Sequence, residues 1–225
     1  MGQRIEFSSN SHTCQGYFAA PASGKGAAVV VIQEWWGLVP HIEDVVDRCA
    51  AEGFTALAPD LYHGATTKSP DDAMKMLMEL DAERAEREIA AAGEHLLSRP
   101  ECSSKTYGVV GFCMGGGLAQ YTATKEDGKV GAAVSFYGGF KNVPFDWDNL
   151  TAPLLQICGE EDQQVTATMR DRDKMLRGKG KKVDLVVYPN AKHAFFNDTR
   201  KEVYNPAAAQ DAWKRTLDWF RTNLR

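Results

Sequence analysis

A cysteine set among glycines is the residue of this sequence best placed to do chemistry. The segment GFCMG at 111–115 carries Cys113 between a β-branched run and a run of small residues. This strand, tight turn and helix context is typical of a nucleophile elbow. Glycines two positions either side avoid collisions at such a bend. The turn also aims backbone N–H groups and a helix N-terminus at the sulfur, which favours the thiolate. We therefore predict that Cys113 is a nucleophile.

A cysteine nucleophile needs a general base, and the chain has five histidines. His193 follows a predicted strand at 184–188 and a Pro-Asn turn, which places it at the carboxyl edge of a parallel sheet. The other four are predicted to lie in loops or in helices: His12, His41, His63 and His95. We therefore pair His193 with Cys113.

A carboxylate is expected to hold the imidazole in the correct tautomer. The predicted strand at 154–158 ends in three acidic residues, Glu160, Glu161 and Asp162, and each is a candidate. All three give the chain order nucleophile, acid, histidine, which is the order in hydrolases of this architecture.

The segment QEWWG at 33–37 follows another predicted strand and forms the fourth candidate site segment. We expect the backbone N–H groups of Trp35 and Met114 to form an oxyanion hole. Glu34 is predicted to project toward Cys113, where a nearby anion opposes thiolate formation. The alternative for Glu34 is a surface position at a strand end. Trp36 is assigned to the pocket wall or the core.

Short β-branched runs alternate with helical patterns, which predicts an α/β fold with a mostly parallel sheet of about eight strands and helices on both faces. The first two strands are expected to form an antiparallel edge hairpin, and residues 1–225 to form a single domain. Strands are predicted at Arg4–Phe7, Gln15–Ala19, Ala27–Gln33, Thr55–Ala58, Thr106–Val110, Gly131–Phe136, Leu154–Cys158 and Asp184–Tyr188. Helices are predicted at Ile42–Glu52, Asp71–Arg99 with a break near Asp81, Gly115–Thr124, Thr166–Lys174 and Pro206–Leu224.

Composition excludes several classes of protein. With 44% hydrophobic residues and a net charge of −4, the chain is neither disordered nor a nucleic-acid or membrane-surface binder. Its apolar runs are too short for a membrane span, and its first residues lack a secretory signal. Five cysteines without Cys-x-x-Cys spacing disfavour disulfides and structural zinc and favour the cytoplasm. We expect a monomer without metal or cofactor.

The motifs together resemble the dienelactone hydrolase family of α/β-hydrolases. The matching segments are QEWWG at 33–37, APDLY at 58–62, GFCMGGG at 111–117, GEEDQQV at 159–165 and KHAFFND at 192–198. The resemblance implies an α/β-hydrolase fold and a triad of Cys113, Asp162 and His193. It also implies that Glu34 contacts the resting thiol, and that the substrate is a dienelactone (a carboxymethylenebutenolide), hydrolysed to maleylacetate.

The chain departs from the dienelactone-specific pattern at two arginine positions. Asn197 stands where an arginine is expected to bind a substrate carboxylate, and a second arginine after APDLY has no counterpart. Arg84 and Arg200 are possible substitutes. We take the substrate-binding candidates to be Trp36, Arg84, Phe195, Asn197 and Arg200. A broad-specificity carboxylesterase or lactonase is the alternative function.

Two further classes remain open on the sequence. One is a noncatalytic ligand-binding protein that retains the pocket. The other is a thiol redox protein in which Cys113 reacts with peroxide and Cys158 serves as the resolving thiol. Turnover of a small-molecule ester separates the hydrolase from both.

Overall fold

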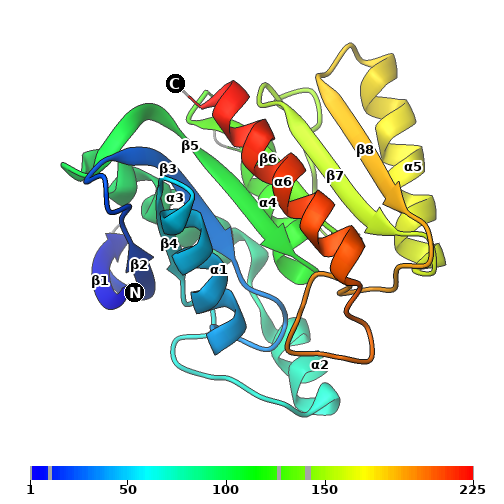
Figure 1. Ribbon diagram of the computed structural model, residues 1–225, viewed down its shortest axis with the longest axis horizontal. Helices are drawn as coiled ribbons and strands as arrows, with labels where there is room; N and C mark the ends of the chain where they lie inside the picture. The colour runs from blue at the N-terminus through cyan, green and yellow to red at the C-terminus, as the bar shows by residue number, and fades with distance from the viewer. Residues whose placement is uncertain (1, 10–11, 126–127, 140–142, 225) are drawn as a thin grey trace.

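An eight-stranded sheet crosses the molecule in the computed structural model, which describes residues 2–9, 12–125, 128–139 and 143–224 (Figure 1). The spatial order is β1-β2-β4-β3-β5-β6-β7-β8. Neighbouring strands from β4 to β8 pair in parallel, whereas β2 pairs antiparallel with both β1 and β4. This confirms the predicted sheet and its antiparallel edge hairpin. The strands are β1 (Gln3–Ser9), β2 (His12–Ala19), β3 (Gly26–Ile32), β4 (Phe54–Pro59), β5 (Cys102–Phe112), β6 (Val130–Phe136), β7 (Leu154–Gly159) and β8 (Val183–Tyr188).

Helices cover both faces of the sheet, as predicted. Two of them, α1 and α6, pack on the face toward the viewer in Figure 1, and α3, α4 and α5 pack on the opposite face. No helix in the described ranges is both long and apolar enough to cross a bilayer. The helices are α1 (Pro40–Ala51), α2 (Pro70–Glu79), α3 (Ala82–Ser98), α4 (Met114–Lys125), α5 (Gln163–Gly178) and α6 (Pro206–Asn223).

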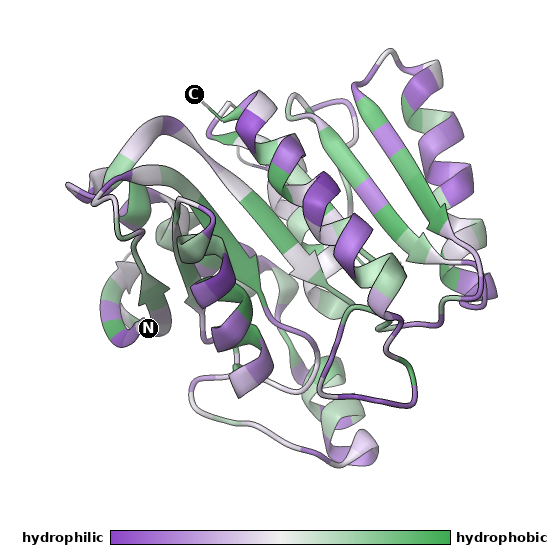
Figure 2. Cartoon of the chain, viewed as in Figure 1, coloured by the Kyte–Doolittle hydropathy of each residue, from purple (hydrophilic) through white to green (hydrophobic). Residues whose placement is uncertain are grey.

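The two helix layers explain why the central strands are continuously apolar. Along β3, Val29 and Val31 pack toward α1, whereas Val30 and Ile32 pack toward α3 and α4. All four side chains are fully buried. Figure 2 shows the same contrast, with hydrophobic colour along the central strands and hydrophilic stretches on the helices. Strands covered on both faces lose the alternation that a half-exposed strand shows.

The break near Asp81 divides the long predicted helix into α2 and α3. Ser69 caps α2 by accepting a hydrogen bond from the Asp72 N–H, and a proline occupies the first helical turn. The Asp81 carboxylate caps α3 by accepting from the N–H groups of Glu83 and Arg84 at 3.0 Å. A cap in the middle of an amphipathic pattern starts a new helix, which is the physical reason for the break.

Helix α5 and strand β5 exceed their predicted lengths the most. Helix α5 covers Gln163–Gly178 rather than Thr166–Lys174, and β5 covers Cys102–Phe112 rather than Thr106–Val110. The added start of β5, residues 102–105, alternates between partly buried and exposed residues, and it pairs with β3 ahead of a register shift. Because this part lacks the continuous apolar run, the criterion used for buried strands misses it.

The bend between β5 and α4 is made by a single residue, Cys113, whose φ is +55°. A Cβ atom on Gly111 would lie 1.9 Å from the carbonyl oxygen of Gly115. A Cβ atom on Gly115 would lie 2.4 Å from the carbonyl oxygen of Ile32, at the end of β3. The first turn of α4 therefore sits directly against two strands, and only glycine fits at both positions.

Replacing Gly111 by alanine tests this close approach. We expect Gly111→Ala to lower the free energy of unfolding by at least about 2 kcal/mol, because the new Cβ meets backbone that cannot move aside. Urea unfolding followed by circular dichroism measures the change. The matched control is Gly178→Ala, where no atom lies within 4 Å of the added Cβ. That control should leave stability unchanged or raise it by up to about 1 kcal/mol. Equal stability of the two variants would contradict the packing argument.

Candidate active site

The loops after β7 and β8 bring an aspartate and a histidine together at the carboxyl edge of the sheet. His193 Nδ1 donates to Asp162 Oδ2 at 2.5 Å. The two loops are tied by backbone hydrogen bonds from the Glu160 N–H to Tyr188 and from the Glu161 N–H to Ala191, at 2.9 and 3.0 Å. The pair is therefore positioned by main-chain contacts between two parallel strand ends.

Of the three acidic candidates, the structure brings Asp162 to the histidine. Asp162 occupies the N-cap position of α5, but its side chain does not cap the helix. Its carboxylate accepts from His193 instead. Glu160 and Glu161 are exposed to solvent. Asp162 is the acid that the family resemblance selects, and the geometry agrees with that selection.

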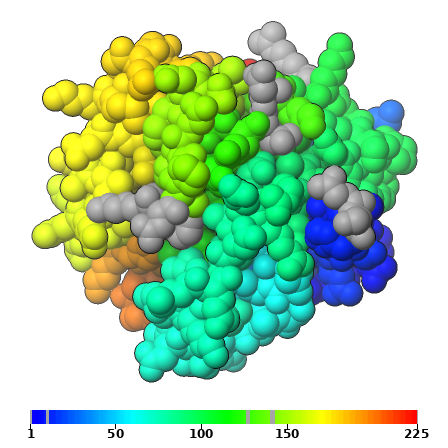
Figure 3. All heavy atoms as spheres, turned by 180° about the vertical axis from the view of Figure 1, so that it is seen from behind, coloured from blue at the N-terminus to red at the C-terminus, as the bar shows by residue number. Residues whose placement is uncertain are grey.

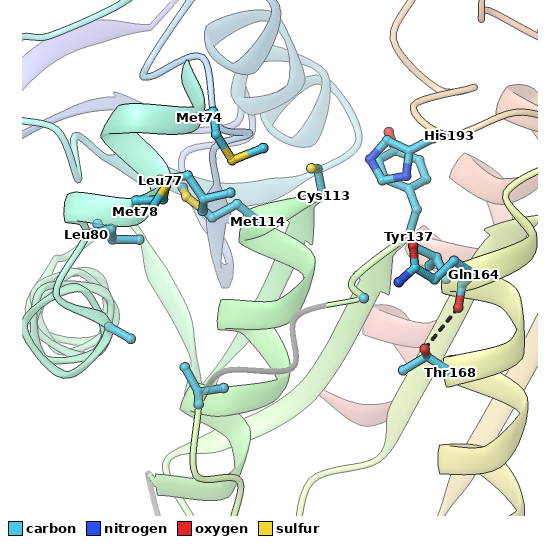
Figure 4. Close-up of a pocket in the computed structure, with 14 residues that line it drawn as sticks. Met74, Leu77, Met78, Leu80, Cys113, Met114, Tyr137, Gln164, Thr168 and His193 are labelled. Carbon is cyan, nitrogen blue, oxygen red and sulfur yellow. Dashed lines mark hydrogen bonds between the residues drawn. The ribbon is translucent and has the colours of Figure 1, made fainter. Parts of the chain in front are cut away.

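Cys113 lies beside His193 at the mouth of a cavity (Figure 4). Burial by itself lowers the pKa of His193, but hydrogen bonds to Asp162 and Cys113 outweigh burial and raise this pKa to about 10. The Tyr137 ring lies 4.9 Å from the imidazole, centroid to centroid. This environment, with the Asp162 carboxylate on one side and the Cys113 sulfur on the other, makes the imidazole a stronger base than a free histidine.

Backbone strain is concentrated around this pair. Five described residues other than glycine have positive φ, and four of them follow β5, β6 or β8 at the same sheet edge. These four are Cys113, Tyr137, Asn190 and Ala194. Left-handed backbone is unfavourable for residues with a Cβ, and it persists where surrounding contacts enforce it. The strain marks this edge as a candidate functional site.

A cavity of about 670 Å³ opens in front of the thiol. Its lining is mostly apolar, and α2 with the following residues forms one wall while α5 and the β6 end form the other (Figure 4). Cys113 lies between the two walls. The lining residues are Met74, Leu77, Met78, Leu80, Ala82, Cys113, Met114, Tyr137, Gly139, Val143, Gln164, Val165, Thr168 and His193.

Glu34 is buried rather than at the surface, with 1% of the residue exposed. Asn197 Nδ2 donates to Glu34 Oε2 at 2.8 Å. Burial raises the pKa of Glu34, and the Asn197 amide together with the charges of His193 and Arg200 opposes that rise. The carboxylate is thus inside the protein and within electrostatic range of the histidine. The surface alternative is wrong.

The candidate oxyanion donors come from two segments in direct contact. Met114 opens α4, and the N–H groups of a first helical turn have no partners within the helix. The same turn packs against the backbone of Ile32 and Gln33, shortly before Trp35. Trp35 and Trp36 contact each other edge to face, with ring centroids 5.0 Å apart. Tyr62 donates from its hydroxyl to the Met114 sulfur at 3.2 Å.

The predicted substrate-binding residues do not line this cavity. Phe195 is fully buried and packs against the rings of Tyr137 and Tyr188 at 5.7 and 5.4 Å, so it belongs to the core. Asn197 is 2% exposed and is committed to Glu34. Both follow His193 closely in sequence, but the chain turns inward there, which a sequence pattern does not reveal.

Neither of the two arginines lines the thiol cavity. Arg84 donates to Glu88 at 2.8 Å and lines a separate cavity of about 260 Å³. Arg200 pairs with Glu202 at 2.9 Å and places its guanidinium 5.8 Å from the centroid of Trp36. Trp36 thus contacts Arg200 rather than the cavity. In the described ranges, the cavity lining contains no arginine and no carboxylate.

Several residues at the site were not singled out from the sequence. Tyr137 follows β6 at the sheet edge, and the position of functional residues after parallel strands could have indicated it. Tyr62 is the last residue of the APDLY motif. Burial is the main cause of its raised pKa, and the nearby Cys113 raises the pKa further. The α2 side chains Met74, Leu77 and Met78 had no signal, because only the tertiary structure places α2 over the cavity.

The fold and the site define an α/β-hydrolase-fold protein with cysteine at the nucleophile-elbow position. This fold commonly has a strand-turn-helix bend with a carboxylate and a histidine on later strand-end loops. Here these positions hold Cys113, Asp162 after β7 and His193 after β8.

Comparison with known proteins agrees with this class. The model of the dienelactone hydrolase family matches residues 14–224. "Protein usf" of Aquifex pyrophilus is 38% identical and "Putative carboxymethylenebutenolidase" of Aquifex aeolicus is 36% identical, each over 100% of both chains. The crystal structure of a dienelactone hydrolase-like promiscuous phosphotriesterase from metagenomic libraries superposes with a TM-score of 0.88 at 23% identity, covering 100% of this chain and 99% of that one. The chain belongs to the dienelactone hydrolase family.

The pH dependence of stability tests the Asp162–His193 contact. The pKa of His193 is raised from 6.5 to about 10. The contact therefore contributes its full stabilisation below about pH 6.5 and loses it as the pH rises toward about 10. We expect the free energy of unfolding of the wild-type protein to fall across this range, and to fall less steeply in Asp162→Asn. Urea unfolding at several pH values measures both slopes.

The control for this comparison is Asp218→Asn, which removes an exposed carboxylate on α6. It should retain the wild-type slope. Identical slopes for Asp162→Asn and the wild type would show that the carboxylate does not hold the imidazolium.

Removing the partner of Glu34 is expected to be costly. Asn197→Ala should lower the free energy of unfolding by about 1–3 kcal/mol, because a buried carboxylate loses its donor. Adding Glu34→Gln should recover part of the loss, since an unpaired amide is less costly than an unpaired charge. Chemical denaturation of the single and double variants measures this coupling. The exposed pair Asn149–Asp146 provides the control, Asn149→Ala, with an expected change below about 0.5 kcal/mol.

Proposed function

We propose that this protein hydrolyses activated carboxylic esters or lactones through a thioester formed on Cys113. The observation that carries the proposal is the placement of a strained cysteine at the β5–α4 bend, beside a histidine hydrogen-bonded to Asp162. A nucleophile, a base and an orienting carboxylate in this order are the parts that acyl transfer requires.

In the proposed cycle, His193 takes the proton of the Cys113 thiol and the sulfur attacks the substrate carbonyl carbon. The N–H groups of Trp35 and Met114 hold the resulting oxyanion. The tetrahedral adduct collapses to a thioester, and the alcohol or enol leaves with a proton from His193. Water activated by His193 then attacks the thioester, and the carboxylic acid leaves as the thiol is restored.

A sulfur nucleophile limits the classes of substrate that the enzyme can hydrolyse. A thiolate is itself a good leaving group, so an adduct with a poor amine leaving group returns to substrate, whereas an enol or phenol departs readily. Lactones of the dienelactone type are enol esters, in keeping with the name of the Aquifex aeolicus relative. The apolar walls of the cavity favour a substrate with an apolar acyl or alkyl part. Because neither Arg84 nor Arg200 lines the cavity, a broad esterase or lactonase activity fits better than strict selection of an acidic lactone.

We assign Glu34 the role of opposing the thiolate in the resting enzyme. Its burial next to Asn197 and its charge coupling to His193 place a carboxylate within range of the reacting groups. Negative charge near a thiol disfavours its ionisation, so Cys113 is expected to rest as the thiol until His193 takes its proton during attack.

The competing functions have less support. A peroxide-reactive Cys113 needs a resolving thiol, and Cys158 is fully buried in β7, where burial raises its pKa and disfavours the thiolate. A noncatalytic binding protein needs the pocket but has no need of the strained elbow or of the aspartate-held histidine. We therefore favour the hydrolase.

We also propose that the chain works as one α/β-hydrolase domain, as a monomer, in the cytoplasm. All five cysteines are free thiols, which suits a reducing compartment.

Turnover of p-nitrophenyl acetate tests the proposed activity. Cys113→Ala and His193→Ala should each reduce kcat/KM by roughly 10³-fold or more, because nucleophile and base act as a unit. Cys102→Ser, which changes a half-buried thiol at the start of β5, serves as the control and should retain full activity. Unchanged turnover in either alanine variant would contradict the assignment, and thiol loss to peroxide without ester turnover would favour the redox function.

A trapping experiment identifies the attacking atom. Incubation with a slowly hydrolysed lactone or ester analogue should add its acyl mass to the one tryptic peptide that contains Cys113. Mass spectrometry of the digested protein locates the adduct. An adduct on any other cysteine would exclude the proposed nucleophile.

A further inference from the structure

A second group of reactive side chains lies outside the thiol cavity, around the N-terminal hairpin. His12 and Cys14 are alternate residues of β2 and therefore project from the same face of the strand. Glu88 on α3 faces them. The ligand atoms of these three residues, an imidazole nitrogen, the sulfur and a carboxylate oxygen, all lie within 4.8 Å of one another.

The carboxylate is the centre of the group. His12 Nε2 lies 3.1 Å from Glu88 Oε1, and His63 Nε2 lies 3.7 Å from the same oxygen. The Glu88 side chain is only 2% exposed, and Cys14 is equally buried. The Glu88 carboxylate accepts from Arg84 at 2.8 Å and also faces two imidazoles and a thiol, which is more than a single ion pair requires. The group has the composition of a metal-binding set.

The identity of the donors points to one class of ion. Nitrogen, sulfur and oxygen donors together suit Zn²⁺, whereas Ca²⁺ and Mg²⁺ require oxygen ligands. Ligands at about 2.0–2.3 Å from a tetrahedral Zn²⁺ lie roughly 3.3–3.8 Å apart, so only a small contraction of the group is needed.

We propose that His12, Cys14 and Glu88 form a Zn²⁺ site, with His63 as the residue available for the fourth position. On binding, the Cys14 thiol releases its proton to solvent and the thiolate coordinates the metal. The site is distinct from the proposed catalytic residues, since none of its members lines the thiol cavity.

An ion can reach this site from solvent, and the Arg84 side chain that now contacts Glu88 can be displaced. His63 and Glu88 line the second cavity of about 260 Å³, which gives an ion a route from solvent. Arg84 donates to Glu88 at 2.8 Å, but 47% of its side chain is exposed, so it can turn outward when a cation takes its place.

A bound Zn²⁺ would link parts of the chain that lie far apart in sequence. His12 and Cys14 belong to the N-terminal hairpin, His63 to the loop after β4, and Glu88 to α3. Figure 3 shows the blue N-terminal hairpin against the segment that contains α3. Zn²⁺ would tie the edge hairpin to the body of the sheet and raise the stability of the folded chain.

Cobalt substitution tests the site with a readout independent of ester hydrolysis. The full-length protein, freed of metal with a chelator, is titrated with Co²⁺ and then with Zn²⁺. We expect one equivalent of Co²⁺ to bind with a sulfur-to-cobalt charge-transfer band, which Zn²⁺ displaces and Mg²⁺ does not. Zn²⁺ should also raise the unfolding temperature of the wild-type protein.

Two variants test proposed ligands, and two others serve as controls. Cys14→Ser should abolish the band, and His12→Asn should weaken Co²⁺ binding at least about tenfold. His12 has 41% of its side chain exposed, so its replacement does not threaten the fold. Cys113→Ser and Cys102→Ser should retain the wild-type band. Loss of the band in Cys113→Ser, an unchanged affinity in His12→Asn, or the absence of any band in the wild type would overturn the proposal.

Discussion

The close approach of one helical turn to two strand ends is the constraint on which the rest of this structure depends. The first turn of α4 lies so near β5 and β3 that a Cβ on Gly111 or Gly115 would meet a backbone oxygen at 1.9 or 2.4 Å. This contact leaves Cys113 as the only residue between strand and helix and holds it at positive φ. The sulfur therefore stands at the tip of the bend, where a helix N-terminus and a histidine both reach it.

Parallel strands supply the other partners without any dedicated scaffold. Because β3, β5, β7 and β8 all run in the same direction, the segments after them meet at one edge. The loops after β7 and β8 are further joined by backbone hydrogen bonds, so the Asp162–His193 pair does not rely on side-chain contacts alone. The aspartate gives up its helix-capping bond in this arrangement, and its carboxylate stabilises the charged imidazole instead.

The chain belongs to the dienelactone hydrolase family, but the residues around its cavity depart from the dienelactone-specific pattern. Cys113, Asp162 and His193, the residues proposed to carry out acyl transfer, lie together at the sheet edge. The residues considered for selecting an acidic substrate do not line the cavity: Asn197 binds Glu34, and Arg84 lies in another cavity. The walls near Cys113 come instead from methionine and leucine side chains of α2, which suit apolar groups of varied shape. The proposed catalytic residues and the apolar walls of the cavity thus come largely from different elements.

The sequence by itself determined the order of strands and helices, and it predicted that Cys113, His193 and an acidic residue after the 154–158 strand lie at one edge of the sheet. These follow from local rules: apolar runs for strands covered on both faces, glycines at a bend, and capping residues such as Asp81 at helix starts. Chain order then assigns each strand-end residue to one edge, so a site formed by several strand ends is predictable. The resemblance was needed to choose Asp162 over Glu160 and Glu161, because spacing alone does not show which side chain turns inward.

Only the tertiary structure decided what surrounds these groups. The direction of Phe195 and Asn197 into the core, the covering of the cavity by α2, and the meeting of Cys14 with Glu88 all depend on contacts between segments that lie on different elements. Such contacts are set by how helices pack across a sheet and by which polar atoms must find partners away from water. Neither condition is written in the spacing of residues along the chain, since each depends on the whole fold being in place.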